Sequence, residues 1–88
     1  MLTKRSETTY LARVNERQAA QVRRDLAARG YAMRLNVPHA RFAAAKDGVS
    51  VTAFTNGKLL VQGKGARDFV EFYLEPAVLK EVSLGYEE

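Results

Sequence analysis

The spacing of hydrophobic and polar positions along this 88-residue chain changes several times, and each spacing predicts a different element. Thr8 to Val14 is β-branched and aromatic, which predicts a strand. Glu16 to Arg29 carries apolar side chains at helical spacing among residues that favour helices. Asn15 and Gln18 have the spacing of a capping box at the start of that helix, and Gly30 suits a left-handed cap at its end.

The central part of the chain alternates apolar and polar residues in short runs. Asp47-Gly48 and Asn56-Gly57 separate some of these runs, and such dipeptides are strong hairpin signals. The runs predict four strands in hairpin succession, at Tyr31 to Asn36, Ala40 to Ala45, Val49 to Phe54 and Lys58 to Gln62. A short second helix is predicted over Ala66 to Leu74, and Pro76 is expected to end it.

The order strand, helix, four strands, helix predicts an α+β domain over residues 1–76 (β-α-β-β-β-β-α). Its sheet is antiparallel with both helices on one face, so the opposite face, called the open face below, is left uncovered. Residues 77–88 combine scattered apolar side chains with an acidic end, and we expect them to form a linker or C-terminal tail.

The side chains on the open face depend on the geometry of the two glycine-containing turns. A two-residue turn at Asn56-Gly57 mixes polar and apolar side chains on both faces of the hairpin. A three-residue turn with the glycine in a bulge makes one face entirely apolar, and burying an unpaired polar group costs ~1–3 kcal/mol. We therefore expect the three-residue turn there. By analogy, the same shift at Asp47-Gly48 points Phe42 outward and Ala43 and Ala45 toward the helices.

The open face predicted in this way combines apolar side chains with hydroxyls, amides and cations. Phenylalanine and leucine in such a position are costly to leave in water unless a partner covers them. The surface suits the shallow, wide minor groove of a nucleic-acid duplex, where sugars offer apolar contact and phosphates line the rim. Its members are Thr9, Leu11, Arg13, Arg34, Phe42, Ser50, Thr52, Phe54, Lys58, Leu60, Gln62 and Lys64.

The amino-acid composition excludes several kinds of site and of protein. The chain has no cysteine and one histidine, His39, which excludes disulfides, thiolate metal sites and multi-histidine metal sites. Hydrophobic residues make up 47% and charged residues 27%, as in globular domains. No apolar run approaches the ~18 residues of a membrane span, and the first residues lack the apolar segment of a signal peptide. A cytoplasmic location is the expectation.

Charge is distributed unevenly along the chain. Residues 1–41 contain nine basic and three acidic side chains, whereas residues 42–88 contain five basic and seven acidic ones. A basic half indicates a polyanionic partner. The ten carboxylates are dispersed, and the sequence offers no nucleophile–base pair or metal-binding cluster. We therefore expect a binding domain without a catalytic residue, metal or cofactor of its own.

Parts of the chain resemble a known family. Arg41 to Lys46 and Gly57 to Gly65 are similar to the N-terminal domain of bacterial ribonuclease HIII, which looks like one repeat of the TATA-binding protein fold. Phe69 to Pro76 and Leu84 to Glu87 extend the resemblance, which runs from Thr8 to about Glu87. It implies a curved sheet whose open face grips an RNA/DNA hybrid and presents it to an RNase H-type catalytic domain in cis.

In the TATA-binding relatives, aromatic and branched residues of the open sheet press into the minor groove. The positions that match here are Leu11, Phe42, Thr52, Phe54, Leu60 and Gln62. Phosphate pairing is expected from four cations, Arg13, Arg34, Lys58 and Lys64. This chain has a single repeat, so it lacks the saddle that kinks DNA. The family's catalytic domain, where Mg or Mn is expected, is not in this sequence.

A second hypothesis gives the same face another role. Apolar patches on sheets also bind proteins, so the domain is alternatively a protein-docking or dimerisation module. No membrane partner is expected, and a monomer is the simplest state. The sequence leaves open whether the chain is a fragment and whether a hybrid, a DNA duplex or an RNA duplex is preferred.

Overall fold

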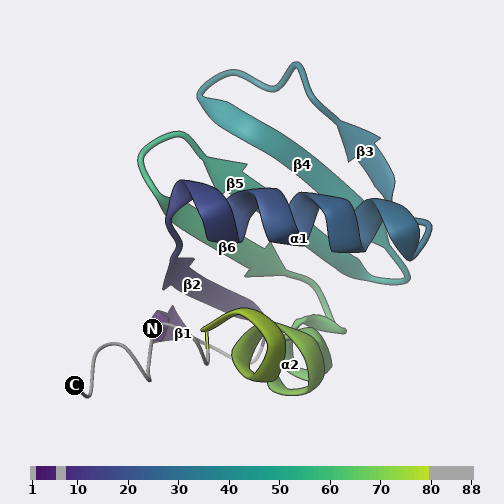
Figure 1. Cartoon of the computed structure of the whole chain (residues 1–88). Helices are drawn as coiled ribbons and strands as arrows, with labels where there is room; N and C mark the ends of the chain where they lie inside the picture. Colours follow the sequence, from purple (N-terminus) through teal and green to yellow (C-terminus); the bar gives the residue numbers. More distant parts are fainter. Residues whose placement is uncertain (1, 6–7, 80–88) are drawn as a thin grey trace.

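A computed structural model of the chain describes residues 2–5 and 8–79, which form a sheet and a helical layer (Figure 1). The strands are β1 (Leu2–Arg5), β2 (Thr9–Arg13), β3 (Ala32–Arg34), β4 (Ala40–Lys46), β5 (Val49–Phe54) and β6 (Lys58–Gln62). The helices are α1 (Glu16–Ala28), α2 (Ala66–Phe69) and the wide, π-type helix η1 (Val70–Leu79), which continues directly from α2.

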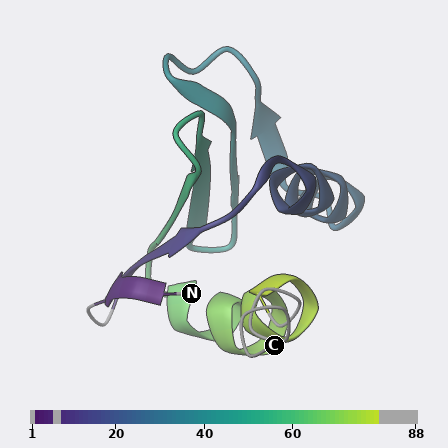
Figure 2. The same ribbon diagram turned by 60° about the vertical axis from the view of Figure 1, so that its left-hand side comes forward.

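The six strands form one antiparallel sheet in the order β1-β2-β6-β5-β4-β3. The helices α1, α2 and η1 lie on the same side of it, which leaves the other face open (Figure 2). The predicted α+β class and the order from β2 onward are therefore confirmed. The edge strand β1 was not predicted, because its residues Leu2–Arg5 show neither β-branched enrichment nor a long alternation.

The first helix begins as the sequence predicts. The Asn15 side chain accepts a 2.8 Å hydrogen bond from the Gln18 backbone N–H, and the Gln18 side chain accepts one of 2.9 Å from the Asn15 N–H. This reciprocal capping box satisfies two backbone donors that the first turn of a helix leaves free. Gly30 follows the helix with φ of +86°, the left-handed conformation predicted for it.

The core lies between the helices and the inner face of the sheet. The largest fully buried side chains are Phe42, Leu26, Leu59, Leu74, Val22, Val51, Val61, Val70 and Val78. Gln18 is the buried polar residue among those described, and its Nε2 donates a 3.2 Å hydrogen bond to the carbonyl of Val78. This bond joins the start of α1 to the end of η1.

The β5–β6 hairpin has the three-residue turn that the polarity argument predicts. Thr52 pairs with Leu60 and Ala53 with Leu59, so Val51, Ala53 and Leu59 all face the core. Gly57 adopts φ of +94° and donates a 3.1 Å hydrogen bond to the Phe54 carbonyl. A glycine in this conformation is what a bulged three-residue turn requires.

The β4–β5 hairpin differs from the prediction by one residue. Asp47 and Gly48 have φ of +50° and +81°, and Lys46 pairs directly with Val49, which defines a two-residue turn of the type I′ geometry that Asp-Gly favours. The expected three-residue turn is wrong at this site. The inward-facing residue of β4 is therefore Phe42, and Ala43 lies on the open face opposite Thr52.

The C-terminal helix also differs from the prediction. Pro76 does not end it: η1 continues to Leu79, with Val78 and Leu79 in the core. Burying these two side chains is worth about 1.5–3 kcal/mol each, which offsets the ~3 kcal/mol that a proline costs within a helix. The carbonyl of Ala77 accepts a 3.2 Å hydrogen bond from the Gln21 side chain, which helps to hold this turn.

The remainder of the predicted tail, residues 80–88, lies outside the described residues. No helix within the described ranges is long and apolar enough to span a membrane.

Candidate nucleic-acid interface

The open face is defined by strand register, because directly opposed residues of an antiparallel sheet point to the same side. One row crosses the middle of the sheet. It runs from β2 to β3 through Leu11, Leu60, Thr52, Ala43 and Arg34. Leu11, Leu60, Thr52 and Ala43 are half-buried and Arg34 is exposed. The centre of the open face is therefore apolar, with a cation at one end.

A second row is polar along half of its length. It contains Thr9, Gln62, Ser50, Ala45 and Ala32, again from β2 to β3. Gln62 and Ser50 are exposed and directly opposite one another, so their amide and hydroxyl groups are both free to meet a ligand. This row offers hydrogen-bond donors and acceptors without a formal charge.

A third row carries two facing cations. Arg13 of β2 lies directly opposite Lys58 of β6, and both are exposed. Phe54 of β5 lies on the same face, opposite Ala40 of β4, and its ring is half-buried. Like charges directly opposite each other destabilise a sheet, so this pair has no structural benefit to the isolated domain. An anion placed between them removes the repulsion.

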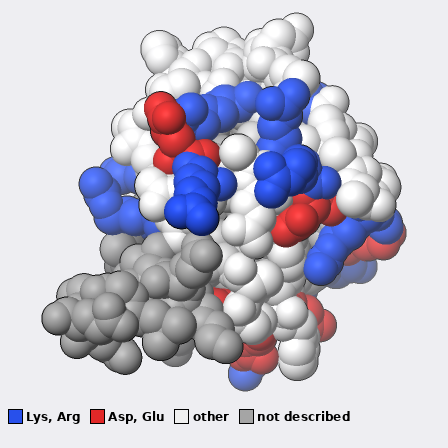
Figure 3. All heavy atoms as spheres, viewed as in Figure 1, with Lys and Arg blue, Asp and Glu red and all other residues white. Residues whose placement is uncertain are grey.

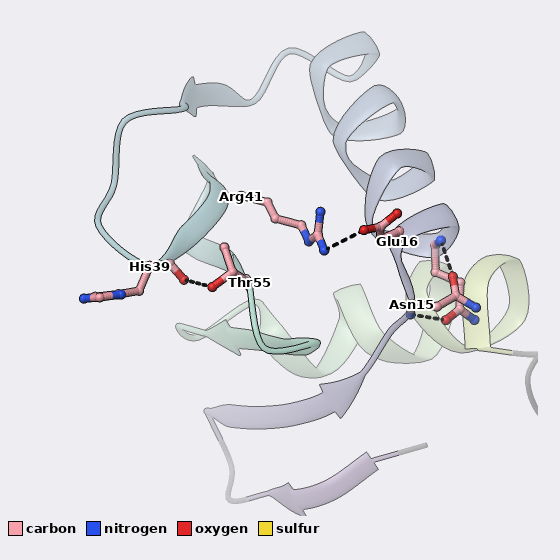
Figure 4. A network of polar contacts seen from close by, with 6 residues as sticks. Asn15, Glu16, His39, Arg41 and Thr55 are labelled. Atoms are coloured by element: carbon pink, nitrogen blue, oxygen red, sulfur yellow. Dashed lines mark hydrogen bonds and ion pairs between the residues drawn. The ribbon is translucent and has the colours of Figure 1, made fainter.

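Acidic side chains are absent from the open face within the described strands. The ion pairs found in residues 8–79 lie elsewhere: Arg41 contacts Glu16 at 3.5 Å, and Arg67 contacts Glu71 at 3.0 Å. Figure 4 shows Arg41 reaching from the sheet toward the start of α1 to meet Glu16. The face therefore has positive charge from Arg13, Arg34 and Lys58 with no local compensation in the described part of the chain.

Most of the predicted site residues lie together as expected. The open face holds Thr9, Leu11, Arg13, Arg34, Ser50, Thr52, Phe54, Lys58, Leu60 and Gln62. Lys64 follows β6, and its side chain lies against the Asp47-Gly48 turn at the end of the sheet. Whether these residues contact a ligand stays a prediction.

Phe42 is the exception. Only 1% of its surface is exposed, and it pairs with Ala53 on the core side of the sheet. Its predicted outward orientation is wrong because the tight Asp47-Gly48 turn reverses the faces of β4. The large ring then replaces the smaller Ala43 and Ala45 in the core, which removes more apolar surface from water. Phe42 therefore supports the fold and does not belong to the candidate interface.

Alanines that the sequence analysis missed complete the open face. Ala32, Ala40, Ala43 and Ala45 cover its β3–β4 half, where no side chain extends beyond a methyl group except Arg34. The signal that could have revealed them is the Asp47-Gly48 dipeptide, which favours a two-residue turn. This half of the face is flat, and the half formed by β2 and β6 carries the larger side chains.

His39, the chain's histidine, lies in the turn before β4. Figure 4 shows the His39 side chain extending away from the protein, while its carbonyl accepts hydrogen bonds from the backbone N–H and the hydroxyl of Thr55 at 3.0 and 3.3 Å. His39 adopts φ of +62°, which the turn before β4 requires. No group of three or more potential ligands in the described residues is arranged to hold a metal ion.

Comparisons with known proteins identify the family of this chain. Residues 9–83 match a family model described as "Domain of unknown function (DUF3378)", so the chain belongs to that family. It is 34% identical to "Ribonuclease HIII" of Protochlamydia amoebophila (strain UWE25) over 77 residues, 88% of this chain and 25% of that protein. The similarity is to the N-terminal domain of ribonuclease HIII.

Two solved structures share the fold. "Crystal structure of Aquifex aeolicus RNase H3" matches with a TM-score of 0.67 and 25% identity, over 74% of this chain and 25% of that chain. "Crystal structure of Bst-RNase HIII in complex with Mn2+" matches with a TM-score of 0.58 and 24% identity, over 78% of this chain and 22% of that chain. The chain spans about a quarter of its curated relatives, and the matched region does not include their catalytic domain.

Proposed function

We propose that the open face binds the backbone and minor groove of an RNA/DNA hybrid, and that the domain presents this substrate to an RNase H-type catalytic domain in cis. The observation that carries the proposal is the facing pair Arg13 and Lys58 beside the half-buried ring of Phe54. Two cations without an acid favour an anionic ligand, and the adjacent ring offers apolar contact to sugars. Phosphate and sugar together describe a nucleic-acid backbone.

The residues of the open face contact different parts of the nucleic acid. Arg13, Arg34 and Lys58 pair with phosphates, and Leu11, Leu60 and Phe54 contact the sugars of the groove. Thr52, Ser50 and Gln62 form hydrogen bonds to 2′-hydroxyls, which distinguish an RNA strand from DNA. The flat alanine half admits a wide, shallow minor groove of the A-like kind. Recognition is by shape and by the ribose hydroxyls, without preference for base sequence.

The charge of the open face argues against self-association as its main role. A two-fold symmetric dimer brings the same patch of each copy together. Arg13, Arg34 and Lys58 would then approach their own counterparts, and the described strands supply no acid on this face to compensate. A nucleic acid meets the same surface with opposite charge.

We expect metal chemistry to take place in the catalytic domain and not in this one. The described residues offer no cluster of ligands, and the Mn2+ named with the Bst-RNase HIII structure belongs to that protein. We expect Mg or Mn to act in the catalytic domain and this domain to need no cofactor. The absence of cysteine is compatible with the cytoplasmic location proposed for it.

A competition titration tests the proposal. Short RNA/DNA hybrid, DNA duplex and RNA duplex of one sequence compete for the 88-residue chain at low salt, with a labelled hybrid as the probe. We expect the hybrid to bind, with log K falling by about 0.9 per log unit of salt for each phosphate contacted. Phe54→Ala/Lys58→Gln should weaken binding at least tenfold without unfolding the chain.

A matched variant controls for the loss of one ring and one charge. Phe72→Ala/Arg67→Gln removes a 76% exposed ring and an exposed cation from the helical side of the domain. It should bind the hybrid like the wild type. Equal loss of binding in both variants, or no measurable binding of any duplex at low salt, would contradict the proposal.

A further inference from the structure

The outward side of α1 is a second positively charged surface. Ala19, Val22 and Leu26 are buried against the sheet, so the opposite stripe of the helix faces away from the protein. Helical spacing places Arg17 and Arg24 on that stripe, two turns and about 10 Å apart along the axis. Both side chains are exposed. Figure 3 shows lysine and arginine atoms on the side of the molecule where α1 lies, with a smaller number of acidic atoms among them.

The arginines on this stripe have no acidic partner in residues 8–79. Of the two acids on α1, Glu16 pairs with Arg41. Asp25 accepts a 2.6 Å hydrogen bond from the Tyr73 hydroxyl. Neither Arg17 nor Arg24 takes part in an ion pair found there, so both guanidinium groups are available to a ligand.

The other residues of this stripe indicate what kind of ligand fits. Ala20 and Ala28 lie on the same stripe and are exposed, and α1 exposes no aromatic or large aliphatic side chain. Protein interfaces depend on such side chains as anchors, usually at their centre. Positive charge on a smooth surface without an apolar anchor is typical of contact with a phosphate backbone.

We propose that this stripe of α1, formed by Arg17, Ala20, Arg24 and Ala28, binds the phosphate backbone of a second nucleic-acid segment. Figure 2 shows α1 on the covered side of the sheet, so a straight duplex lying on the open face does not reach its outward side. The domain therefore holds two segments at once, one on each side. The stripe acts independently of the open face and does not require that face to bind hybrid.

Stoichiometry tests this inference. The wild-type chain is titrated with a short RNA/DNA hybrid at about 50 mM salt, and complexes are counted by native mass spectrometry. We expect two hybrids per chain for the wild type and one for Arg17→Gln/Arg24→Gln, since glutamine keeps the helix and removes the charge. In the Phe54→Ala/Lys58→Gln background, one hybrid should remain, and adding the α1 substitutions should remove it. The salt slope of that remaining complex measures the contacts of the stripe, about 1.8 for two phosphates.

A charge-compensated variant distinguishes the effect of the two arginines from the effect of the net charge of the chain. Asp68→Asn/Glu75→Gln removes two exposed acids from α2 and η1, so adding it to Arg17→Gln/Arg24→Gln restores the net charge. This variant should still bind a single hybrid. Recovery of the lost hybrid in this variant, or an Arg17→Gln/Arg24→Gln variant that binds as many hybrids as the wild type, would overturn the inference. So would a polyglutamate peptide that binds the stripe more tightly than the hybrid, because that result assigns it to an acidic protein.

Discussion

The Tyr73 hydroxyl donates a 2.6 Å hydrogen bond to Asp25 Oδ2 and thereby joins η1 to the C-terminal part of α1. The guanidinium of Arg29 lies 4.4 Å from the centre of the Tyr73 ring, so the ring is held from two directions. Burial, reinforced by the bond to Asp25, raises the pKa of the Tyr73 hydroxyl above its ordinary value. Together with the bonds from Gln18 and Gln21, this contact holds η1 against α1.

The Tyr73–Asp25 bond predicts a specific alkaline response. A raised pKa in the folded state contributes stability that is complete below the unfolded tyrosine pKa of about 10 and is lost as pH rises further. Tyr73→Phe should lower the free energy of unfolding by about 1–3 kcal/mol at neutral pH and flatten the decline above pH ~10. Urea unfolding between neutral and alkaline pH measures both. Tyr31→Phe is the control, since no hydrogen bond of its hydroxyl is found in the described residues, and it should be neutral at pH ~7.

The two phenylalanines of the central hairpins should behave in opposite ways. Phe42→Ala leaves a cavity in the core and should cost about 3–5 kcal/mol of stability. Phe54→Ala on the open face should cost about 1 kcal/mol and weaken hybrid binding. Thermal unfolding and the hybrid titration, run on both variants, check the contrast. Loss of binding with unchanged stability in Phe42→Ala would contradict the assignment of that ring to the core.

Gly63 occupies a position that no side chain fits. A Cβ there would lie 2.0 Å from the Gly48 carbonyl oxygen, and the residue has φ of +112°. Gly63→Ala should therefore destabilise the domain by at least about 2 kcal/mol by displacing the β4–β5 turn from the end of β6. Gly57→Asn serves as a comparison, because its Cβ meets its nearest neighbour at 3.4 Å. It should cost about 1 kcal/mol, and chemical denaturation of both variants distinguishes the two positions.

The capping box of α1 predicts the effect of a small substitution. Asn15→Ala removes the acceptor for the Gln18 backbone N–H and should lower stability by about 0.5–2 kcal/mol. Asn15→Ser retains an acceptor and should stay within about 0.5 kcal/mol of the wild type. Thermal melts of the two variants measure the difference. Equal melting temperatures for Asn15→Ala and Asn15→Ser would show that the cap contributes nothing.

The sequence predicted one hairpin correctly and the other incorrectly, for a physical reason. At Thr55 to Gly57 only one register keeps polar groups out of the core, so polarity determines the turn. In β4 both registers bury apolar side chains, either Phe42 or its alanine neighbours. Polarity therefore does not distinguish between the two registers. The size of the ring and the turn preference of Asp47-Gly48 decide instead. The cations and hydroxyls of the open face lie on other strands, so most of the site could still be predicted.

Tertiary contacts explain the parts that the sequence did not predict. Pro76 ends a helix when only local preferences are considered, but Val78 and Leu79 gain burial only if the helix continues past it. The strand β1 exists through its pairing with β2, and its own residues give a weak signal. Leu35 and Phe72 are 54% and 76% exposed although both side chains are hydrophobic. Their exposure therefore depends on how the elements pack and not on residue type.

The alanines at positions 32, 40, 43 and 45 determine how closely anything can approach the sheet. A methyl group is the shortest side chain with a β-carbon, so a molecule resting there comes within van der Waals distance of the main chain itself. Steric clearance then limits what fits on this half of the open face. Lengthening one of these side chains changes the shape of the accepted molecule while leaving every cation in place.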